Sequence, residues 1–367
     1  MERKIESVIS KFFEVPLDEP LVDAKHGVHT HFHLITTTIS LNDGNCGTGY
    51  TYTGGTGGQA IKSLIDHDIR PFILGRNPDE IEEVNEALQW HLHYVGRGGI
   101  ASFAISAIDV ALWDLRGKQL ELPLWKMAGG AHNKCKAYCG GIDLDFSTPK
   151  LLESIKGYLE KGVTGVKIKV GKTNLRDDLE RIKHVRDLIG PQTELMVDAN
   201  YSMTEEAAIK AGLEFKRYGI LWFEEPIEPD LYSGYASIAA HTDIDLAMGE
   251  NLHTQHEFDQ AFRDANLSYI QPDASNCCGI TGWLKIAKKA KKCGVKISSH
   301  GMHELHVSLV AAQNKMNWME VHSFPIDKFT KRPLQLHKGY AIAPDMPGIG
   351  VEFDWKKLEI LAQSPAK

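Results

Sequence analysis

Three acidic residues each end an apolar run of the sequence, at equal intervals along the chain. The run ELMVD stops at Asp198, ILWFE at Glu224 and LAMGE at Glu250, so each acid lies 26 residues from the next. One strand followed by one helix fits such an interval, and the carboxyl ends of the strands form one face of a parallel barrel. We therefore predict that the three carboxylates lie at matching heights on three consecutive strands.

Carboxylates that converge in this way repel one another unless a cation lies between them. No cysteine or histidine belongs to the set, and hard oxygen ligands favour Mg²⁺ ahead of Mn²⁺ or Ca²⁺. The alternative is that each acid caps the helix after its strand, a role that suits Asp better than Glu. Capping would be the better interpretation of a single acid, but three acids in successive repeats indicate a Mg²⁺ site.

The segment GVKIKVGK places Lys167 and Lys169 within an apolar run, one repeat before Asp198. Alternate residues of a strand face the same side, so both lysines are predicted to point into the mouth of the barrel. A metal ion and two ammonium groups in one cluster would lower the pKa of one lysine, which could then act as a general base. The other lysine could bind a substrate anion. The alternative is an edge strand whose lysines reach solvent.

Two further polar residues end later runs, one repeat apart. Asp273 lies in QPDAS and His300, 27 residues on, lies in ISSHG. An aspartate on one strand end can accept a hydrogen bond from an imidazole on the next, which orients the ring and raises its basicity. A single histidine is more often structural. Glu320, in WMEVH, ends the eighth run.

The distribution of apolar runs suggests how these residues are positioned. From about residue 135, eight short apolar runs alternate with helix-like segments, which indicates parallel strands joined by helices and closed into a barrel. Before it, residues 1–130 form a separate unit, with a strand in 31–43, a turn-rich loop over 43–58 and a helix in 104–120. We expect the barrel to span 131–330, and 331–367 to return to the first unit.

Composition excludes several other classes of protein. The net charge of −7 argues against a nucleic-acid binder. No apolar run approaches the roughly 20 residues that span a bilayer, and the first residues lack the apolar core of a signal peptide. The six cysteines have no zinc-pair spacing and are interpreted as reduced thiols, so the expected location is the cytoplasm.

The ordered set of motifs resembles the enolase superfamily and, within it, the mandelate racemase subgroup. The resemblance covers nearly the whole chain and includes AISAIDVALWDLRGK at 104–118. It implies an α/β fold, in which an N-terminal α+β capping domain precedes a modified (β/α)₇β TIM-like barrel. It also implies a Mg²⁺ cofactor, a small-molecule carboxylate substrate and a homo-oligomer between a dimer and an octamer. The matching residues are Lys167 and Lys169 in K-x-K, Asp198 and Asn200 in D-x-N, Glu224 in E-E-P, Glu250 in G-E, and then Asp273, His300 and Glu320.

The resemblance also implies a role for each of these positions. Asp198, Glu224 and Glu250 would bind Mg²⁺. Lys169 would be the base on one face of the substrate, supported by Lys167, and His300, paired with Asp273, would be the acid or base on the opposite face. Glu320 would donate a hydrogen bond to the substrate carboxylate, which requires it to be protonated.

Two shorter stretches, DAKHG at 23–27 and GMHELHVSLVAAQ at 301–313, resemble acid-sugar dehydratases that act on galactarate or talarate. The loops of that family that determine the substrate fall at about 20–28 and 48–54. An alternative is that their polar residues are simply solvated. The residues predicted to contact substrate are Asp23, Lys25, His26, Tyr50, Tyr52, Asn200 and His303.

The expected activity is a Mg²⁺-dependent hydro-lyase that removes the proton α to the carboxylate of a sugar acid. Loss of the β-hydroxyl would then give a 2-keto-3-deoxy acid. Because two bases are present, a racemase or epimerase of a 2-hydroxy acid is the alternative. We also considered a non-catalytic barrel, which would lack a ligand or base, and a zinc hydrolase built on HTHFH (29–33) or HELH (303–306), which has no HExxH motif.

Overall fold

An antiparallel sheet of three strands begins the chain in the computed structural model, which describes residues 2–324 and 326–363. Its strands are β1 (Ile5–Asp23), β2 (Gly27–Leu41) and β3 (Cys46–Thr53), in the order β1-β2-β3. Short helices and two longer ones follow: α1 (Gly58–Leu64), the π-helix η1 (Ile65–Ile69), α2 (Arg70–Ile73), α3 (Ile81–Leu92), α4 (Ile100–Leu120) and α5 (Leu124–Met127). Buried and exposed residues alternate along much of β1, so one face of this sheet packs on the helices.

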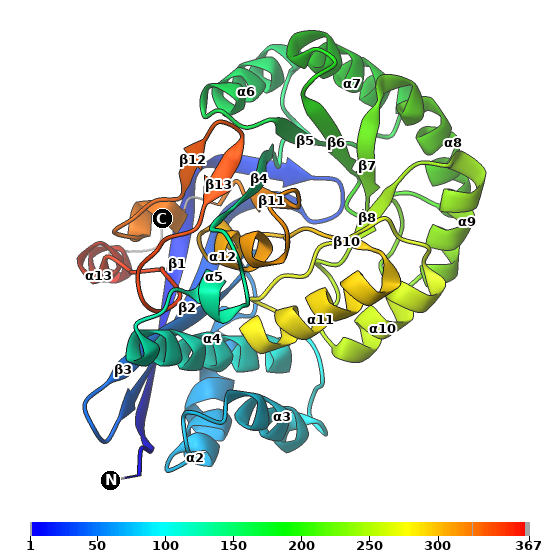
Figure 1. The fold of residues 1–367 in the computed structure, drawn as a ribbon. Coiled ribbons are helices and arrows are strands. Elements are labelled where there is room, and N and C mark those ends of the chain that lie inside the picture. The colour runs from blue at the N-terminus through cyan, green and yellow to red at the C-terminus, as the bar shows by residue number, and fades with distance from the viewer. Residues whose placement is uncertain (1, 325, 364–367) are drawn as a thin grey trace.

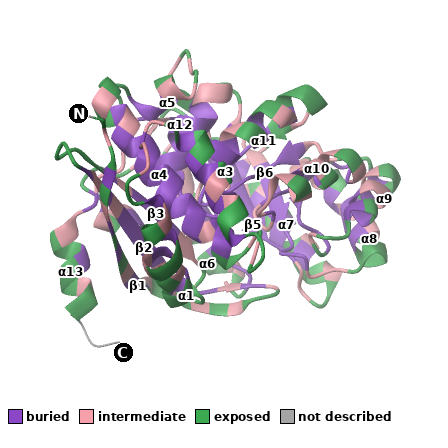
Figure 2. Cartoon of the chain, turned by 90° about the horizontal axis from the view of Figure 1, so that it is seen from below, coloured by how far each residue is buried: buried purple, intermediate pink, exposed green. Residues whose placement is uncertain are grey.

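Helix α4 forms the core of this first unit and is buried along most of its length (Figure 2). It packs so closely on β3 that a Cβ at Gly49 would lie 2.2 Å from the carbonyl oxygen of Ala107. The prediction of a turn-rich loop over 43–58 is therefore wrong for 46–53. The glycines there allow a strand to lie against a helix rather than forming turns.

Eight parallel strands, alternating with helices, form the barrel (Figure 1). The strands are β4 (Lys134–Gly140), β5 (Gly165–Lys169), β6 (Glu194–Asp198), β7 (Ile220–Glu224), β8 (Leu246–Met248), β9 (Tyr269–Ile270), β10 (Lys296–Ile297) and β11 (Trp318–Val321). The helices are α6 (Thr148–Glu160), α7 (Leu175–Ile189), α8 (Glu205–Phe215) with the 3-10 turn η2 (Lys216–Tyr218), α9 (Tyr232–Thr242), α10 (Gln255–Asp264), α11 (Gly279–Cys293) and α12 (His303–Gln313).

The barrel closes because β4 pairs with β5 on one side and with β11 on the other. Between the short β10 and β11, side chains replace the backbone ladder: Ser298 Oγ donates to the Trp318 carbonyl at 2.8 Å, and the Glu320 amide donates to Ser299 Oγ at 3.3 Å. A helix follows each of the first seven strands, whereas a 3-10 turn follows β11. The structure is the modified (β/α)₇β barrel that the resemblance implied, with an N-terminal capping domain.

The C-terminal segment runs back along the first unit. It contains η3 (Ile326–Phe329), the hairpin of β12 (Gln335–His337) and β13 (Tyr340–Ile342), and α13 (Trp355–Gln363). Strand β13 pairs with β4, and α13 lies beside β1, where Glu359 pairs with Lys11 at 3.3 Å (Figure 1). The domain boundaries at 130 and 330 stay a prediction. In the described part of the chain, no helix has both the length and the apolar character to cross a membrane.

Candidate active site

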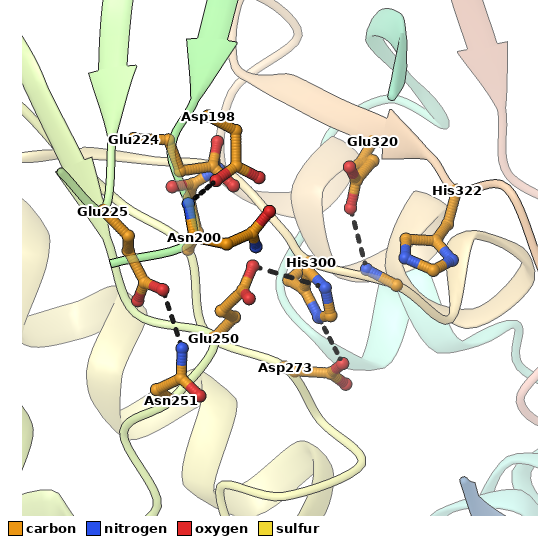
Figure 3. A network of polar contacts seen from close by, with 12 residues as sticks. Asp198, Asn200, Glu224, Glu225, Glu250, Asn251, Asp273, His300, Glu320 and His322 are labelled. Atoms are coloured by element: carbon orange, nitrogen blue, oxygen red, sulfur yellow. Dashed lines mark hydrogen bonds and ion pairs between the residues drawn. The ribbon is translucent and has the colours of Figure 1, made fainter. Parts of the chain in front are cut away.

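The three predicted metal ligands converge at the carboxyl ends of β6, β7 and β8 (Figure 3). Asp198, Glu224 and Glu250 each offer an oxygen, and these atoms lie within 4.8 Å of one another. Asp198 and Glu224 are direct register partners, but Glu224 pairs with Ala247, so Glu250 lies three residues beyond the matching height. The expectation of equal height is wrong for Glu250, because the chain turns after β8 at Gly249, whose φ of 142° suits glycine.

Buried donors hold two of these carboxylates in place. Glu224 Oε2 accepts hydrogen bonds from Trp222 Nε1 at 2.9 Å and Gln271 Nε2 at 2.8 Å. Asp198 Oδ1 accepts from the Asn200 amide at 2.9 Å. Burial, together with the nearby Asp198 and Glu250 carboxylates, raises the pKa of Glu224 to about 7, although Lys167 opposes this shift. A divalent cation with oxygen ligands fits this site, because it would offset the repulsion among three converging acids.

Glu225, the second acid of E-E-P, supports the site from outside the ligand set. Its carboxylate accepts from Asn251 Nδ2 at 2.7 Å and from the Gly249 amide at 3.4 Å, so it braces the turn that carries Glu250 (Figure 3). Sequence reasoning did not assign it a role. The alternation of a strand gives a signal, because adjacent residues cannot both face the barrel interior.

Both lysines of K-x-K point into the cluster, as predicted, and form ion pairs there. Lys167 Nζ lies 2.5 Å from Glu224 Oε1, 3.0 Å from Glu320 Oε1 and 3.5 Å from Asp198 Oδ2. Lys169 Nζ lies 2.5 Å from Asp198 Oδ2. Burial acts to lower the pKa of Lys169, but the surrounding carboxylates outweigh it and raise the pKa. The pKa of Lys169 is raised because acids outnumber ammonium groups in the cluster. The predicted lowering, which requires the metal ion as well, stays a prediction.

His300 and Asp273 form the predicted pair. His300 Nδ1 lies 3.0 Å from Asp273 Oδ2, which also accepts from the Tyr52 hydroxyl at 2.8 Å. His300 Nε2 lies 3.4 Å from Glu250 Oε2 (Figure 3). Burial opposes a proton on this ring, but Glu250 and the hydrogen bond with Asp273 raise its pKa to about 10.

Glu320 also lies in the cluster, in a different protonation state from the one the resemblance requires. Its Oε2 accepts from the Gly301 amide at 3.1 Å, and its Oε1 lies 3.0 Å from Lys167 Nζ. Burial would favour the neutral acid, but Lys167 and the nearby histidines lower the pKa of Glu320. Without substrate an ammonium group lies against this carboxylate, and the expectation of a protonated Glu320, which concerns the complex with substrate, stays a prediction.

A cavity of about 570 Å³ opens above these residues and is shared by the barrel and the capping domain. Of the predicted catalytic, metal and substrate residues, those lining it are Asp23, His26, Tyr52, Lys169, Asn200, Glu250, Asp273 and His300. Asp198, Glu224, Lys167 and Glu320 form the buried layer beneath it.

Three predicted substrate residues do not line this cavity. Tyr50 is buried and its hydroxyl donates to Glu304 Oε1, so its side chain serves the packing of β3 on α12. His303 Nε2 lies 3.2 Å from Asp327 Oδ2, and its Nδ1 accepts from a backbone amide, which turns the ring away. Lys25 is exposed, and its backbone amide donates a hydrogen bond to Asp23 Oδ1 at 2.9 Å. This geometry does not support direct substrate contact by these three residues, and that contact stays a prediction.

His322 lines the cavity and was missed. Its ring centroid lies 5.2 Å from that of His300, and its Nδ1 accepts from the Phe324 amide at 3.2 Å (Figure 3). Burial lowers its pKa to about 3, so the ring is neutral and its Nε2 carries the proton. The signal was present, because His322 lies two residues after Glu320, directly after β11, and alternate residues of an extended segment share a face.

The arrangement suits removal of a weakly acidic proton next to a carboxylate. Lys169 ends β5 and His300 follows β10, and the three converging carboxylates come from the ends of strands that lie between them in the sheet order. A substrate held against the cation would therefore have an amine on one side and an imidazole on the other.

Comparisons with known proteins agree on the family. The model of the mandelate racemase / muconate lactonizing enzyme N-terminal domain matches residues 7–129, and the model described as enolase C-terminal domain-like matches 150–357. A 3,6-anhydro-α-L-galactonate cycloisomerase of Streptomyces coelicolor is 39% identical over 98% of this chain and 99% of its own. An L-talarate/galactarate dehydratase of Salmonella typhimurium is 34% identical over 95% of this chain and 88% of its own. A crystal structure described as a racemase from Streptomyces coelicolor with bound magnesium superimposes with a TM-score of 0.95, at 38% identity, covering 97% of this chain and 99% of that one.

Proposed function

Because the chain belongs to the mandelate racemase/muconate lactonizing enzyme family of the enolase superfamily, we propose that it removes the proton α to the carboxylate of a sugar acid and expels an oxygen from the β-carbon. The enzyme is Mg²⁺-dependent, with Asp198, Glu224 and Glu250 as the proposed ligands. The observation that carries the proposal is the convergence of these three carboxylates between Lys169 and His300.

Stabilisation of charge on the substrate carboxylate is the first requirement of this reaction. When bound, Mg²⁺ supplies positive charge that offsets the negative charge growing on the two carboxylate oxygens. The Lys167 ammonium group, buried beside the cluster, adds a second positive charge. One well-placed donor of this kind contributes about 3 to 4 kcal/mol in related reactions. A base alone, which contributes about 10²- to 10⁴-fold, would not be sufficient.

The two bases divide the proton transfers. Lys169 Nζ takes the proton from the α-carbon, the electron pair of that bond forms the carbon–carbon double bond, and the bond from the β-carbon to oxygen breaks. His300 gives its proton to the departing oxygen, and Asp273 holds the ring in position. The enol then becomes a 2-keto-3-deoxy acid. Before it can act as a base, Lys169 Nζ must release to solvent the proton that its ion pair with Asp198 stabilises.

The leaving oxygen decides which reaction is catalysed. When it belongs to an anhydro ring, elimination opens the ring and the enzyme is a cycloisomerase; when it is a free hydroxyl, water is lost and the enzyme is a dehydratase. Ring opening is our first candidate, supported by 39% identity with a cycloisomerase across nearly the full length of both chains. Dehydration is the second, supported by the 34% identity with a dehydratase.

A substrate panel in D₂O tests the proposal. Purified protein with Mg²⁺ is incubated with 3,6-anhydroaldonates, aldonates and aldarates, and the products are identified by NMR and mass spectrometry. Ring opening gives a keto acid of unchanged atomic composition, whereas dehydration gives one lighter by a water molecule. Deuterium at the α-carbon without a keto acid indicates epimerisation and contradicts the elimination. Absence of both exchange and keto acid across the panel contradicts the proposal as a whole.

A further inference from the structure

The outer wall of the cavity comes from the capping domain and contains a buried acid, Asp23. Its Oδ1 accepts from the amides of Lys25 at 2.9 Å and His26 at 2.7 Å. Its Oδ2 lies 3.0 Å from His26 Nδ1 and 2.8 Å from His29 Nε2. Although burial opposes it, the bonds from the two histidines lower the pKa of Asp23. A negative charge is therefore fixed at this end of the cavity.

The histidines of this wall are already engaged by protein groups. His26 Nε2 lies 2.5 Å from the Tyr201 hydroxyl, so both of its nitrogens have partners. His31 Nε2 lies 4.0 Å from Glu14 Oε2, and its Nδ1 lies 3.0 Å from the Thr30 hydroxyl. His253 Nδ1 accepts from the Gly99 amide at 3.1 Å. Acidic side chains therefore lie beside three of these rings, Asp23 beside His26 and His29 and Glu14 beside His31.

Two amide oxygens in the cavity wall have no partner in the protein. Asn200 Oδ1 and Asn276 Oδ1 are buried and accept no hydrogen bond. The orientation of Asn276 is fixed, because its Nδ2 donates to the Glu250 carbonyl at 2.6 Å. These amide oxygens can accept a hydrogen bond from a hydroxyl but not from a carboxylate, which has no proton to donate. A buried polar group left unpaired costs about 1 to 3 kcal/mol.

From this wall we infer that the substrate is a sugar acid with a single carboxylate, whose other end is uncharged. The inference rests on the proposed elimination and selects among its substrates. The single carboxylate lies at the inner end, beside Lys167, Lys169 and the cation. Hydroxyls of the substrate near the proposed metal ligands donate to the free amide oxygens of Asn200 and Asn276, and Thr30 and Thr56 line the wall at the outer end.

A second carboxylate at the outer end would lack a free cation, because Asp23 already holds the rings of His26 and His29. Among the described lining residues, Lys169 is the sole lysine and arginine is absent, so the strong cations lie at the inner end. Carboxylate recognition in proteins relies on such groups, above all on arginine. Aldarates, which carry a carboxylate at each end, are therefore poor substrates, in contrast to the resemblance of 23–27 and 301–313 to galactarate and talarate dehydratases.

Matched substrates test this inference. Values of kcat/KM are measured for 3,6-anhydroaldonates, for aldonates and for aldarates, including galactonate and galactarate, which differ only at C6. We expect the best monoacid to exceed every aldarate by at least about 100-fold. An aldarate within tenfold of the best monoacid overturns the inference but leaves the proposed function intact, whereas absence of turnover and exchange with all three classes overturns the function itself.

The role of Asp23 is tested by Asp23→Asn, which keeps the shape of the side chain and removes its charge. The readout is the ratio of kcat/KM for the best aldarate to that for the best monoacid, which is independent of the fraction of folded enzyme. We expect this ratio to rise at least tenfold, because His26 and His29 become available to the second carboxylate. The control is Glu19→Gln, which removes one negative charge from the same strand outside the cavity. An unchanged ratio in Asp23→Asn, or an equal rise in the control, overturns the assignment.

Discussion

Lys169 and His300 depend on their neighbours for their chemistry, and single residues of the sequence reveal only part of that dependence. The alternation of GVKIK was sufficient to place both lysines in the barrel, because side chains of a strand alternate without exception between two faces. The protonation states were not accessible in the same way. They depend on the number of acids within a few ångströms of each ammonium group. Lys167, for example, contacts three acids: Asp198, Glu224 and Glu320.

At this scale, removal of either base is expected to abolish product formation. Lys169→Ala and His300→Asn should each lower kcat for the best sugar acid by about 10³-fold or more, since general acid–base catalysis contributes about 10²- to 10⁴-fold. The separate roles appear in proton exchange measured by NMR in D₂O. Lys169→Ala should lose exchange at the α-carbon, whereas His300→Asn should retain it without elimination.

The control for these variants is Lys183→Ala, which removes an exposed lysine paired with Asp187 on α7 and should keep full activity. Exchange that persists in Lys169→Ala but disappears in His300→Asn would assign the base to the other side of the cavity.

The elements that carry these residues could be predicted where one repeat of the chain resembles the next. Equal spacing of Asp198 and Glu224 corresponds to direct register partners on β6 and β7. The same spacing did not predict the height of Glu250, because β8 is only three residues long and the chain turns before this residue. Strand β3 was missed for a related reason: Gly49 resembles a turn residue in the sequence, whereas its role is to let α4 approach, and that contact is formed by residues distant in the sequence.

Helix α4 also meets the barrel through a buried carboxylate, and this contact leads to a prediction on stability. Asp109 Oδ1 accepts from the Thr281 amide at 2.9 Å on α11, and its Oδ2 accepts from Asn85 Nδ2 at 2.7 Å on α3. Burial raises the pKa of Asp109 to about 6, above its ordinary value of 3.8. The folded state therefore binds this proton more tightly, so the stabilisation is complete below pH 3.8 and is lost as the pH rises through 6.

Asp109→Asn should remove this contribution to the pH dependence. Between pH 4 and pH 7 the free energy of unfolding of the unmodified protein should fall relative to that of the variant by about 2 to 3 kcal/mol, because a tenfold difference in proton affinity corresponds to about 1.36 kcal/mol. Urea denaturation at a series of pH values measures the difference. Parallel pH profiles for the two proteins would contradict a raised pKa at Asp109.

For the molecule as a whole, the proposed metal site links three strands of the barrel and should couple cation binding to stability. A ligand present at about 100 times its Kd stabilises the folded state by about 2.7 kcal/mol. We expect Mg²⁺ to raise Tm and EDTA to lower it, with activity lost and restored in parallel. Because the pKa of Glu224 is raised to about 7, binding displaces a proton, so Mg²⁺ affinity should increase from pH 6 to pH 8.

Calorimetry with Asp198→Asn checks this coupling, with Asp187→Asn on the exposed face of α7 as the control. The first variant should lose the Mg²⁺-dependent rise in Tm and the second should keep it. An equal rise in both would place the cation elsewhere.

The seam between capping domain and barrel completes the cavity, and Tyr201 joins its two sides. Tyr201 follows the metal ligand strand β6, and its hydroxyl lies 2.5 Å from His26 Nε2 on the capping-domain loop. Tyr201→Phe removes this bond and should let the loop open. A hydrogen bond contributes about 0.5 to 1.5 kcal/mol, so KM for the best substrate should rise by about two- to tenfold, with kcat nearly unchanged. Tyr235→Phe is the matched control, because the Tyr235 hydroxyl donates to the Ile227 carbonyl at 2.8 Å away from the cavity. Tyr235→Phe should lower stability and leave KM unchanged. A KM that is also unchanged in Tyr201→Phe would show that other contacts hold the loop over the substrate.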